Sequence, residues 1–251
     1  MSVRTAATEA VSLLLPVECV GCGRWDVSLC EECEAVLRRR PVRCEQQTVL
    51  LSGAGTRPVL PTWSVGPYRG VLRATVLGWK THRRSDIAPR VLRAAADVAA
   101  QWSADPDLRE LLGDEPCVVV VPAPSGWRRR LARRLVVGDL ADAVARGLAS
   151  GAPGPRELLV ADVLRRRGGP AHQAGTGARG RVVNRDGTVR CRAGLPAEMA
   201  VLLVDDVVTT GATLSACAEA VRAAGGRPVA AFTLASTESP TGSGRALRGA
   251  R

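Results

Sequence analysis

Apolar positions along the chain follow two spacings, and their alternation predicts a sheet with helices between its strands. The run CVVVV at 117–121 is apolar at consecutive positions, which is typical of a parallel strand buried on both faces. Similar runs predict three more strands at 157–160, 200–204 and 228–235, and helical spacing occurs at 70–79, 86–102, 139–149 and 213–226. Strands that alternate with helices predict a parallel α/β sheet with right-handed crossovers.

The segments around this sheet predict how the chain is divided. Residues 1–15 predict a short helix that stops at Pro16, and residues 31–40 predict a second one. A stretch rich in Gly, Ser and Pro before the sheet predicts a linker. The predicted divisions are an N-terminal helix and metal module at 1–44, the linker at 45–61, the α/β domain at 62–237 and a disordered basic tail at 238–251.

One segment inside the predicted domain has no periodic pattern. Residues 164–187 are rich in Arg and Gly, so we expect a long mobile loop there. A loop of this length in a compact domain is usually either functional or disordered.

The chain is strongly basic, with a formal net charge of +11. Such a charge favours polyanionic partners, for example nucleic acids or phosphorylated metabolites. The basic residues are almost all arginine, which also fits a compositional bias, so both interpretations stay open. Lys80 is the single lysine. Either this position needs a compact ammonium rather than a flat guanidinium, or the lysine is there by chance.

The sequence offers no candidate for a membrane-spanning helix, because no apolar run approaches the ~18 residues that such a helix needs. The apolar stretch near the N-terminus lacks the positive charge and the small-residue cleavage site of a signal peptide. We therefore expect a cytoplasmic protein without membrane insertion, whose eight cysteines are reduced or metal-bound.

Four cysteines near the N-terminus have the spacing of a metal site. Cys19 with Cys22, and Cys30 with Cys33, form two C-x-x-C pairs that are separated by seven residues. Four thiolates satisfy tetrahedral zinc and leave no open position, which predicts a structural Zn²⁺ site. Free thiols and an iron–sulfur cluster are the alternatives. Cys44 stands apart from this set.

The stretch VLLVDDVVTTGATL at 201–214 predicts a ribose 5-phosphate site. An apolar strand would carry two acids to its carboxyl end, where ligands bind in α/β sheets. The threonine-rich turn that follows would offer hydroxyls and the unpaired N–H groups of a helix start to a phosphate. The two carboxylates can accept hydrogen bonds from a sugar diol and hold Mg²⁺ through water. The predicted site comprises Asp205, Asp206, Thr209, Thr210, Gly211, Ala212 and Thr213.

This stretch resembles the fingerprint of the type I phosphoribosyltransferases, which bind phosphoribosyl pyrophosphate (PRPP). The resemblance implies their parallel-sheet fold, PRPP as a ligand with Mg²⁺, and transfer of the phosphoribosyl group to an acceptor. A Walker A loop is excluded, because the chain has no Gly-Lys-Ser or Gly-Lys-Thr.

Cysteine pairs ahead of such a domain, followed by YRGVLRATVLGWKTHRRSDIA, are similar to the competence protein ComF family. The similarity extends to VVVVPAPSGWRRRLARR and to HQAGTGARGRVVN, and covers about residues 16–236. The residues that carry it are Tyr68, Gly70, Lys80, Arg83, Arg84, Gln173, Arg181 and Asn184. Two departures stand out: ARRLVVGDL replaces the family's Arg-Gly-Phe-Asn-Gln segment, and further cysteine pairs near Cys44 are missing.

The resemblance implies a division of roles in the predicted site. Asp205 and Asp206 would hold the ribose, while Lys80, Arg83 and Arg84 would neutralise the departing pyrophosphate together with Mg²⁺. A flexible loop with Gln173, Arg181 and Asn184 would close over the site. No residue identifies the acceptor.

Two other functions remain open from the sequence. The resemblance implies a link to single-stranded DNA and DNA uptake, and arginines could form a phosphate-binding stripe, although 3% aromatic residues are few for base stacking. The candidate stripe comprises Arg128, Arg129, Arg130, Arg133, Arg134 and Arg165–Arg167. A regulator that binds PRPP without transferring anything is the other alternative, and a homodimer is left open.

Overall fold

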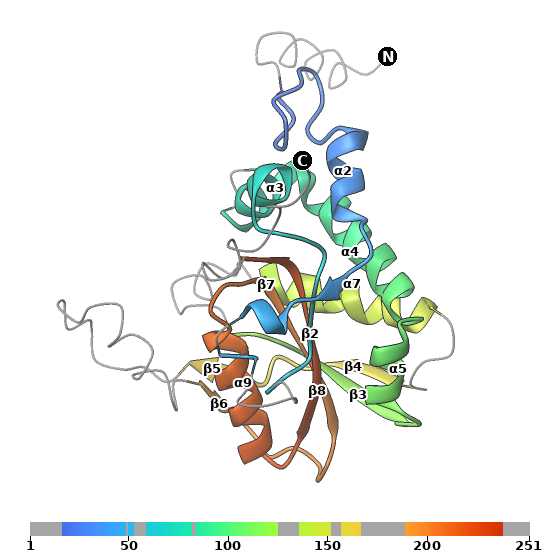
Figure 1. Cartoon of the computed structure of the whole chain (residues 1–251), viewed down its shortest axis with the longest axis vertical. Coiled ribbons are helices and arrows are strands. Elements are labelled where there is room, and N and C mark those ends of the chain that lie inside the picture. The colour runs from blue at the N-terminus through green and yellow to red at the C-terminus, as the bar shows by residue number, and fades with distance from the viewer. Residues whose placement is uncertain are drawn as a thin grey trace, which may run out of the picture.

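The computed structural model describes residues 17–48, 50–52, 59–81, 84–124, 136–151, 157–166 and 189–237. Over these residues the chain forms a mixed α/β fold around a mostly parallel sheet (Figure 1). This confirms the predicted fold class at that level. The predicted helix at 1–15 and the basic tail at 238–251 lie outside the described residues.

The central sheet has six strands within the described ranges, in the order β1-β2-β8-β7-β3-β4. They are β1 (Val42–Arg43), β2 (Thr62–Ser64), β3 (Cys117–Pro122), β4 (Glu157–Val160), β7 (Ala200–Val208) and β8 (Arg227–Ser236). Only the β1–β2 pairing is antiparallel among these neighbours. The four strands that apolar runs predict therefore form the parallel centre and one edge.

Strand β7 is longer than its apolar run predicts. It pairs with β8 as far as Val208 opposite Ser236, so its hydrogen-bonded ladder passes beyond the four apolar residues. Asp205 and Asp206 are consequently residues of the strand itself, near its carboxyl end.

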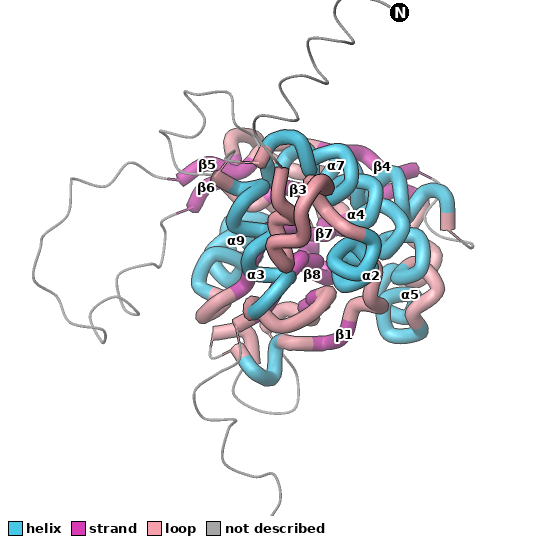
Figure 2. The backbone as a smooth tube through the Cα atoms, turned by 90° about the horizontal axis from the view of Figure 1, so that it is seen from above, coloured by secondary structure: helices cyan, strands magenta, loops and turns pink. Residues whose placement is uncertain are grey.

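Helices cover both faces of the sheet. Helices α4 (Ala88–Trp102) and α7 (Val136–Ser150) pack on one face together with Leu202 and Val204 of β7. Helix α9 (Ala212–Ala223) packs on the other face with Val201 and Leu203. Side chains of a strand alternate between its faces, so β7 contributes to both cores. Seen from above, α9 lies across β7 and β8 from α4 and α7 (Figure 2).

Three further helices complete the described helical structure beside two short 3₁₀ turns, Glu45–Gln47 and Ser85–Ile87. They are α2 (Glu31–Leu37), α3 (Gly70–Lys80) and α5 (Pro106–Leu112). Helix α5 is absent from the sequence prediction, although Asp105 caps it by accepting from Asp107 N and Leu108 N. Among the described helices, none has the length and hydropathy that a bilayer-spanning segment needs.

The described part of the predicted linker is packed into the fold. Leu51 and Leu60 are fully buried in the core beneath α9. The carboxylate of Glu45, which is also buried, accepts a hydrogen bond from Thr62 N at 3.2 Å. The apolar and acidic residues scattered through this Gly- and Ser-rich stretch therefore attach it to the sheet.

The predicted loop at 164–187 starts as a strand. Strand β5 (Leu164–Arg166) pairs antiparallel with β6 (Val189–Cys191). This small ladder is the described base of the segment, and residues 167–188 lie outside the described ranges.

Candidate functional site

Strand β7 directs its two acids to different sides of the sheet, as consecutive strand residues do. Asp206 points toward α3, where it meets Lys80. Asp205 lies near Cys217 of α9. Burial and the charge of the Asp205 carboxylate raise the pKa of the Cys217 thiol. The Asp205 carboxyl group also accepts a hydrogen bond from the Asp206 backbone, with Asp206 N 2.9 Å from Oδ1.

Lys80 and Asp206 form an ion pair across the site. Lys80 is the last residue of α3, and its Nζ lies 2.7 Å from Asp206 Oδ1 and 2.5 Å from Oδ2. The Asp206 side chain is only 5% exposed, so its charge is compensated where water has little access. The chain's single lysine thus contacts the second acid of the predicted ribose-binding pair.

Asp205 titrates in a different range from an ordinary carboxyl group. Burial and the adjacent Asp206 charge raise the pKa of Asp205 to about 7, against the opposing effects of Asp206 N–H and Lys80. When two carboxyl groups lie side by side, the negative charge of one opposes the ionisation of the other, so the two lose their protons at different pH values. The pair therefore offers one carboxylate held by Lys80 and one carboxyl group that gains or loses its proton near neutral pH.

The turn after β7 requires a glycine and opens a helix. Gly211 has a φ of +79°, and a Cβ there would lie 2.5 Å from Leu51 Cγ and 2.7 Å from Thr48 Cγ2. Only glycine satisfies both the left-handed backbone and this close approach. Gly211 precedes α9, and no side chain caps that helix. The N–H groups of its first turn are therefore directed outward with the positive end of the helix dipole.

A cavity of about 340 Å³ lies where these elements meet. Its lining comprises Tyr68, Lys80, Ala123, Pro124, Val137, Arg166, Asp205, Asp206, Val207, Thr209 and Thr213. The structure thus brings together both acids, Lys80 and two of the three predicted threonines. Thr210, Gly211 and Ala212 form the adjoining turn and helix start.

Two lining residues extend the predicted site. Arg166, at the end of β5, donates from Nε to Pro124 O at 3.2 Å, and its place in the cavity depends on the β5–β6 ladder. Tyr68 comes from the segment between β2 and α3. The arginine run at 165–167 is the only sequence signal for Arg166, and it does not identify which arginine reaches the cavity.

Other predicted site residues lie elsewhere or outside the described ranges. Arg84 does not line the cavity; its guanidinium donates to Glu18 O at 2.6 Å and to Ser28 O at 3.0 Å. A basic residue beside α3 therefore binds backbone carbonyls near the cysteines. Residues that lie outside the described part of the chain are Arg83, Gln173, Arg181, Asn184, Arg128–Arg130, Arg133, Arg134 and Arg167.

The four cysteines of the two C-x-x-C pairs come together in space. The Sγ atoms of Cys19, Cys22, Cys30 and Cys33 all lie within 4.8 Å of one another. We call residues 18–33 the cysteine knuckle. Cys22 is exposed and the other three are buried, while Cys44 is buried apart from them in the core beneath α9. This grouping meets the geometric requirement for a shared metal ion.

The knuckle backbone favours a thiolate. Burial acts to raise the pKa of the Cys19 thiol, but N–H groups from Cys30, Cys22 and Gly21 outweigh it and lower this pKa to about 6. Cys30 N lies 3.3 Å from Cys19 Sγ. Metals bind the thiolate form of cysteine, so the backbone prepares one ligand of the cluster.

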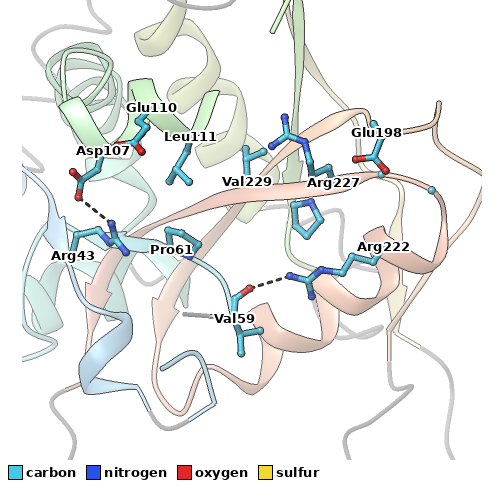
Figure 3. A pocket seen from close by; sticks show the side chains of 13 residues that line it. Arg43, Val59, Pro61, Asp107, Glu110, Leu111, Glu198, Arg222, Arg227 and Val229 are labelled. Carbon is cyan, nitrogen blue, oxygen red and sulfur yellow. Dashed lines mark hydrogen bonds and ion pairs between the residues drawn. The ribbon is translucent and has the colours of Figure 1, made fainter. Parts of the chain in front are cut away.

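A larger cavity of about 950 Å³ lies at the opposite, amino end of β8 (Figure 3). Its arginines are engaged: Arg43 pairs with Asp107 at 3.0 Å, and Arg222 donates to Val59 O at 3.0 Å. The walls mix both charges and aim no common set of groups at one point. Ligands of open α/β sheets bind at the carboxyl ends of the strands, which favours the smaller cavity.

No family model matches the chain, and no curated protein matches it.

Proposed function

We propose that this protein is a ComF-like phosphoribosyltransferase that binds PRPP with Mg²⁺ and transfers the phosphoribosyl group to an acceptor. One observation carries the proposal. Two carboxyl groups near the carboxyl end of β7 face the same cavity as the start of α9, an uncapped helix. Three residues, 209–211, separate the end of β7 from this helix. We assign the α/β domain to the type I phosphoribosyltransferase fold on the same basis.

The helix start would bind the 5-phosphate of the ribose. Thr209 and Thr213 line the cavity and offer hydroxyl groups, and the first-turn N–H groups of α9 add donors with a favourable dipole. Gly211 allows the backbone to turn tightly beneath the phosphate. No acidic side chain lies within this turn, so the acids remain available to the sugar.

The acids would bind the ribose diol. Asp206 is held by Lys80 and can accept hydrogen bonds from vicinal hydroxyls, as can Asp205 once it is ionised. Carboxylate oxygens are also the ligands that Mg²⁺ prefers, so this donor set fits the cation. Mg²⁺, when bound, would offset the charge of the pyrophosphate.

Transfer breaks the bond between ribose C1 and the pyrophosphate oxygen, and the acceptor's lone pair forms the new bond to C1. Positive charge develops on the ribose ring and negative charge on the leaving group. Carboxylates beside the ring and cations beside the pyrophosphate stabilise this separation. Asp205 and Asp206 supply the first, and Lys80 and Arg166, which line the same cavity, are the described candidates for the second.

The cysteine knuckle would hold one structural Zn²⁺. Four thiolates close the coordination of zinc, and the mutual approach of the four Sγ atoms supports such a site. A closed site supplies rigidity, and the chemistry stays with the cavity.

Calorimetric titration with PRPP, with and without Mg²⁺, tests the proposed function. We expect micromolar binding that needs Mg²⁺ and is lost in the Asp205→Asn/Asp206→Asn variant, because its amides cannot bind the cation or the diol as strongly. Asp142→Asn, at an exposed position of α7, is the matched control. Unchanged affinity in the double variant would refute the site, and binding without turnover on any acceptor would favour a PRPP-sensing regulator.

A further inference from the structure

The cysteine knuckle lies directly on α3. A Cβ at Gly78 of α3 would come within 2.7 Å of Val20 Cγ2, and one at Gly21 would come within 3.0 Å of Val71 Cγ1. Val71 and Gly78 belong to the first and last turns of α3. The knuckle therefore contacts this helix at both ends.

Gly78 is a costly residue for a helix. Glycine in a helix interior destabilises it relative to alanine, and φ at Gly78 is not positive. Its advantage is the missing side chain, which lets Val20 approach the helix backbone. The packing of the knuckle thus explains a residue that the helix itself disfavours.

Arg84 ties the end of α3 to the same knuckle. Its guanidinium donates to Glu18 O and Ser28 O, and Asp86 holds the guanidinium from the other side at 3.0 Å. Arg84 N also donates to Gly78 O at 3.3 Å. The last turn of α3 is therefore held through both side-chain packing and hydrogen bonds.

Lys80 follows Gly78 by two positions and reaches Asp206 across the cavity. We infer that the cysteine knuckle positions Lys80, because its contacts with Gly78 and Arg84 fix the end of the helix from which Lys80 extends. Gly78 and Arg84 are positioning residues in this scheme. The effect on PRPP binding and the response to a chelator rest on the proposed function, whereas the effect of Gly78 and Arg84 on the Lys80–Asp206 pair does not.

Acylation of Lys80 tests the inference at a single site, because the chain has no other lysine. The full-length protein is treated with an amine-acylating reagent, and the modification of Lys80 is followed by peptide mass spectrometry. Contact with Asp206 protects the amine, so Asp206→Asn defines the rate without protection. We expect Gly78→Ala to accelerate labelling several-fold toward that rate, and a zinc chelator to do the same to the unchanged protein.

Two variants separate positioning from a general loss of stability. Val20→Ala removes the methyl groups that meet the new Cβ, so Val20→Ala/Gly78→Ala should return to slow labelling. Leu77→Ala alters the neighbouring position on the exposed side of α3 and should label at the original rate.

Wild-type labelling in a folded Gly78→Ala variant, or no response to the chelator in protein that metal analysis shows to contain zinc, would overturn the inference. If Gly78→Ala does not fold by circular dichroism, the chelator experiment alone decides.

PRPP titration of the same proteins distinguishes the two proposals. Absence of PRPP binding to the unchanged protein rejects the proposed function while the labelling result stands. Equal PRPP affinity despite faster labelling rejects the link between the knuckle and the ligand.

Discussion

At the residue scale, the site is built around two adjacent acids, one in direct ion-pair contact with Lys80 and one whose charge is only partly offset. Asp206 contacts Lys80 through both carboxylate oxygens. Asp205, its neighbour on β7, is partly buried, and the effect of Lys80 on it is outweighed by burial and by the Asp206 charge. The same strand therefore contains a carboxylate that is stabilised by the fold and a carboxyl group whose ionisation the fold opposes.

The raised pKa of Asp205 predicts a pH-dependent cost to stability. Its pKa rises from 3.8 to about 7 on folding, so between these values the native state binds more protons than the unfolded state. Stability contributed by this group is present at low pH and is lost as pH rises through about 7. Asp205→Asn should therefore be more stable than the unchanged protein at pH 8, on the order of 1 kcal/mol or more, since one pKa unit corresponds to about 1.4 kcal/mol.

Thermal unfolding at pH 4 and pH 8 measures this difference. The gain in Tm of Asp205→Asn should be present at pH 8 and shrink at pH 4, where the native carboxyl group is protonated and the unfolded one is only partly ionised. Asp142→Asn should show no such pH-dependent gain. An equal Tm shift at both pH values would contradict the assigned pKa.

At the element scale, the turn between β7 and α9 depends on a segment far away in the sequence. Leu50 N donates to Thr210 O at 3.1 Å, and Thr48 and Leu51 occupy the space next to Gly211. Thr48, Leu50 and Leu51 therefore support the turn that the proposed function assigns to the phosphate.

Gly211→Ala should destabilise the protein by about 2–5 kcal/mol. The left-handed backbone costs a non-glycine residue roughly 1–2 kcal/mol, and forcing a methyl group into a packed core adds about 1–3 kcal/mol. Gly194→Ala is the matched control, because the nearest atom to its added Cβ is Ala224 O at 4.0 Å. Urea unfolding compares the two, and equal losses would refute the steric account.

At the scale of the whole molecule, the cysteine knuckle shares its core with the α/β domain. Cys19, Leu29 and Cys33 lie in the same buried cluster as Trp79 of α3 and Val91 of α4. Arg90 of α4 also donates to Leu29 O and pairs with Glu34. Disruption of the knuckle is therefore expected to weaken the domain on which it lies.

Cys19→Ser should lose the bound zinc and lower the Tm of the whole chain. Metal analysis of the purified protein should find about one zinc per chain in the unchanged protein, as one Cys₄ site predicts, and in Cys117→Ser, whose thiol lies outside the knuckle. Retention of zinc by Cys19→Ser would show that the ligands are assigned wrongly. Loss of zinc without a change in Tm would contradict the shared core.

Local sequence patterns predicted many of the helices and strands, but they could not predict the contacts between residues far apart in the sequence. Valine-rich runs predicted β3 and β7 because a buried parallel strand needs apolar residues on both faces. Strand β1 has only two residues and is held by pairing with β2, so it has no local signature. Helix α5 did carry a signal, Asp105 followed by Pro106, which is typical of a helix start.

The same distinction applies to the candidate site. The sequence from Asp205 to Thr213 is local, and the structure brings both acids, Thr209 and Thr213 to one cavity. The resemblance implied that Arg84 neutralises the pyrophosphate, yet its guanidinium binds the backbone carbonyls of Glu18 and Ser28 and pairs with Asp86, which no pattern of side chains reveals. The contact between Lys80 and Asp206 joins residues 126 positions apart and depends on the whole fold.

The pairing of β2 with β8 has a consequence for biosynthesis. Thr62–Ser64 pairs in parallel with Ala231, Phe232 and Thr233. This early segment of the nascent chain therefore cannot form its strand pairing until β8, the final described strand, has left the ribosome. The knuckle cysteines are close in sequence and can gather around a metal ion long before then. Distant pairing of this kind slows folding. We therefore expect the metal site to assemble first during translation, and the surface that receives Lys80 to form only after β7 has emerged.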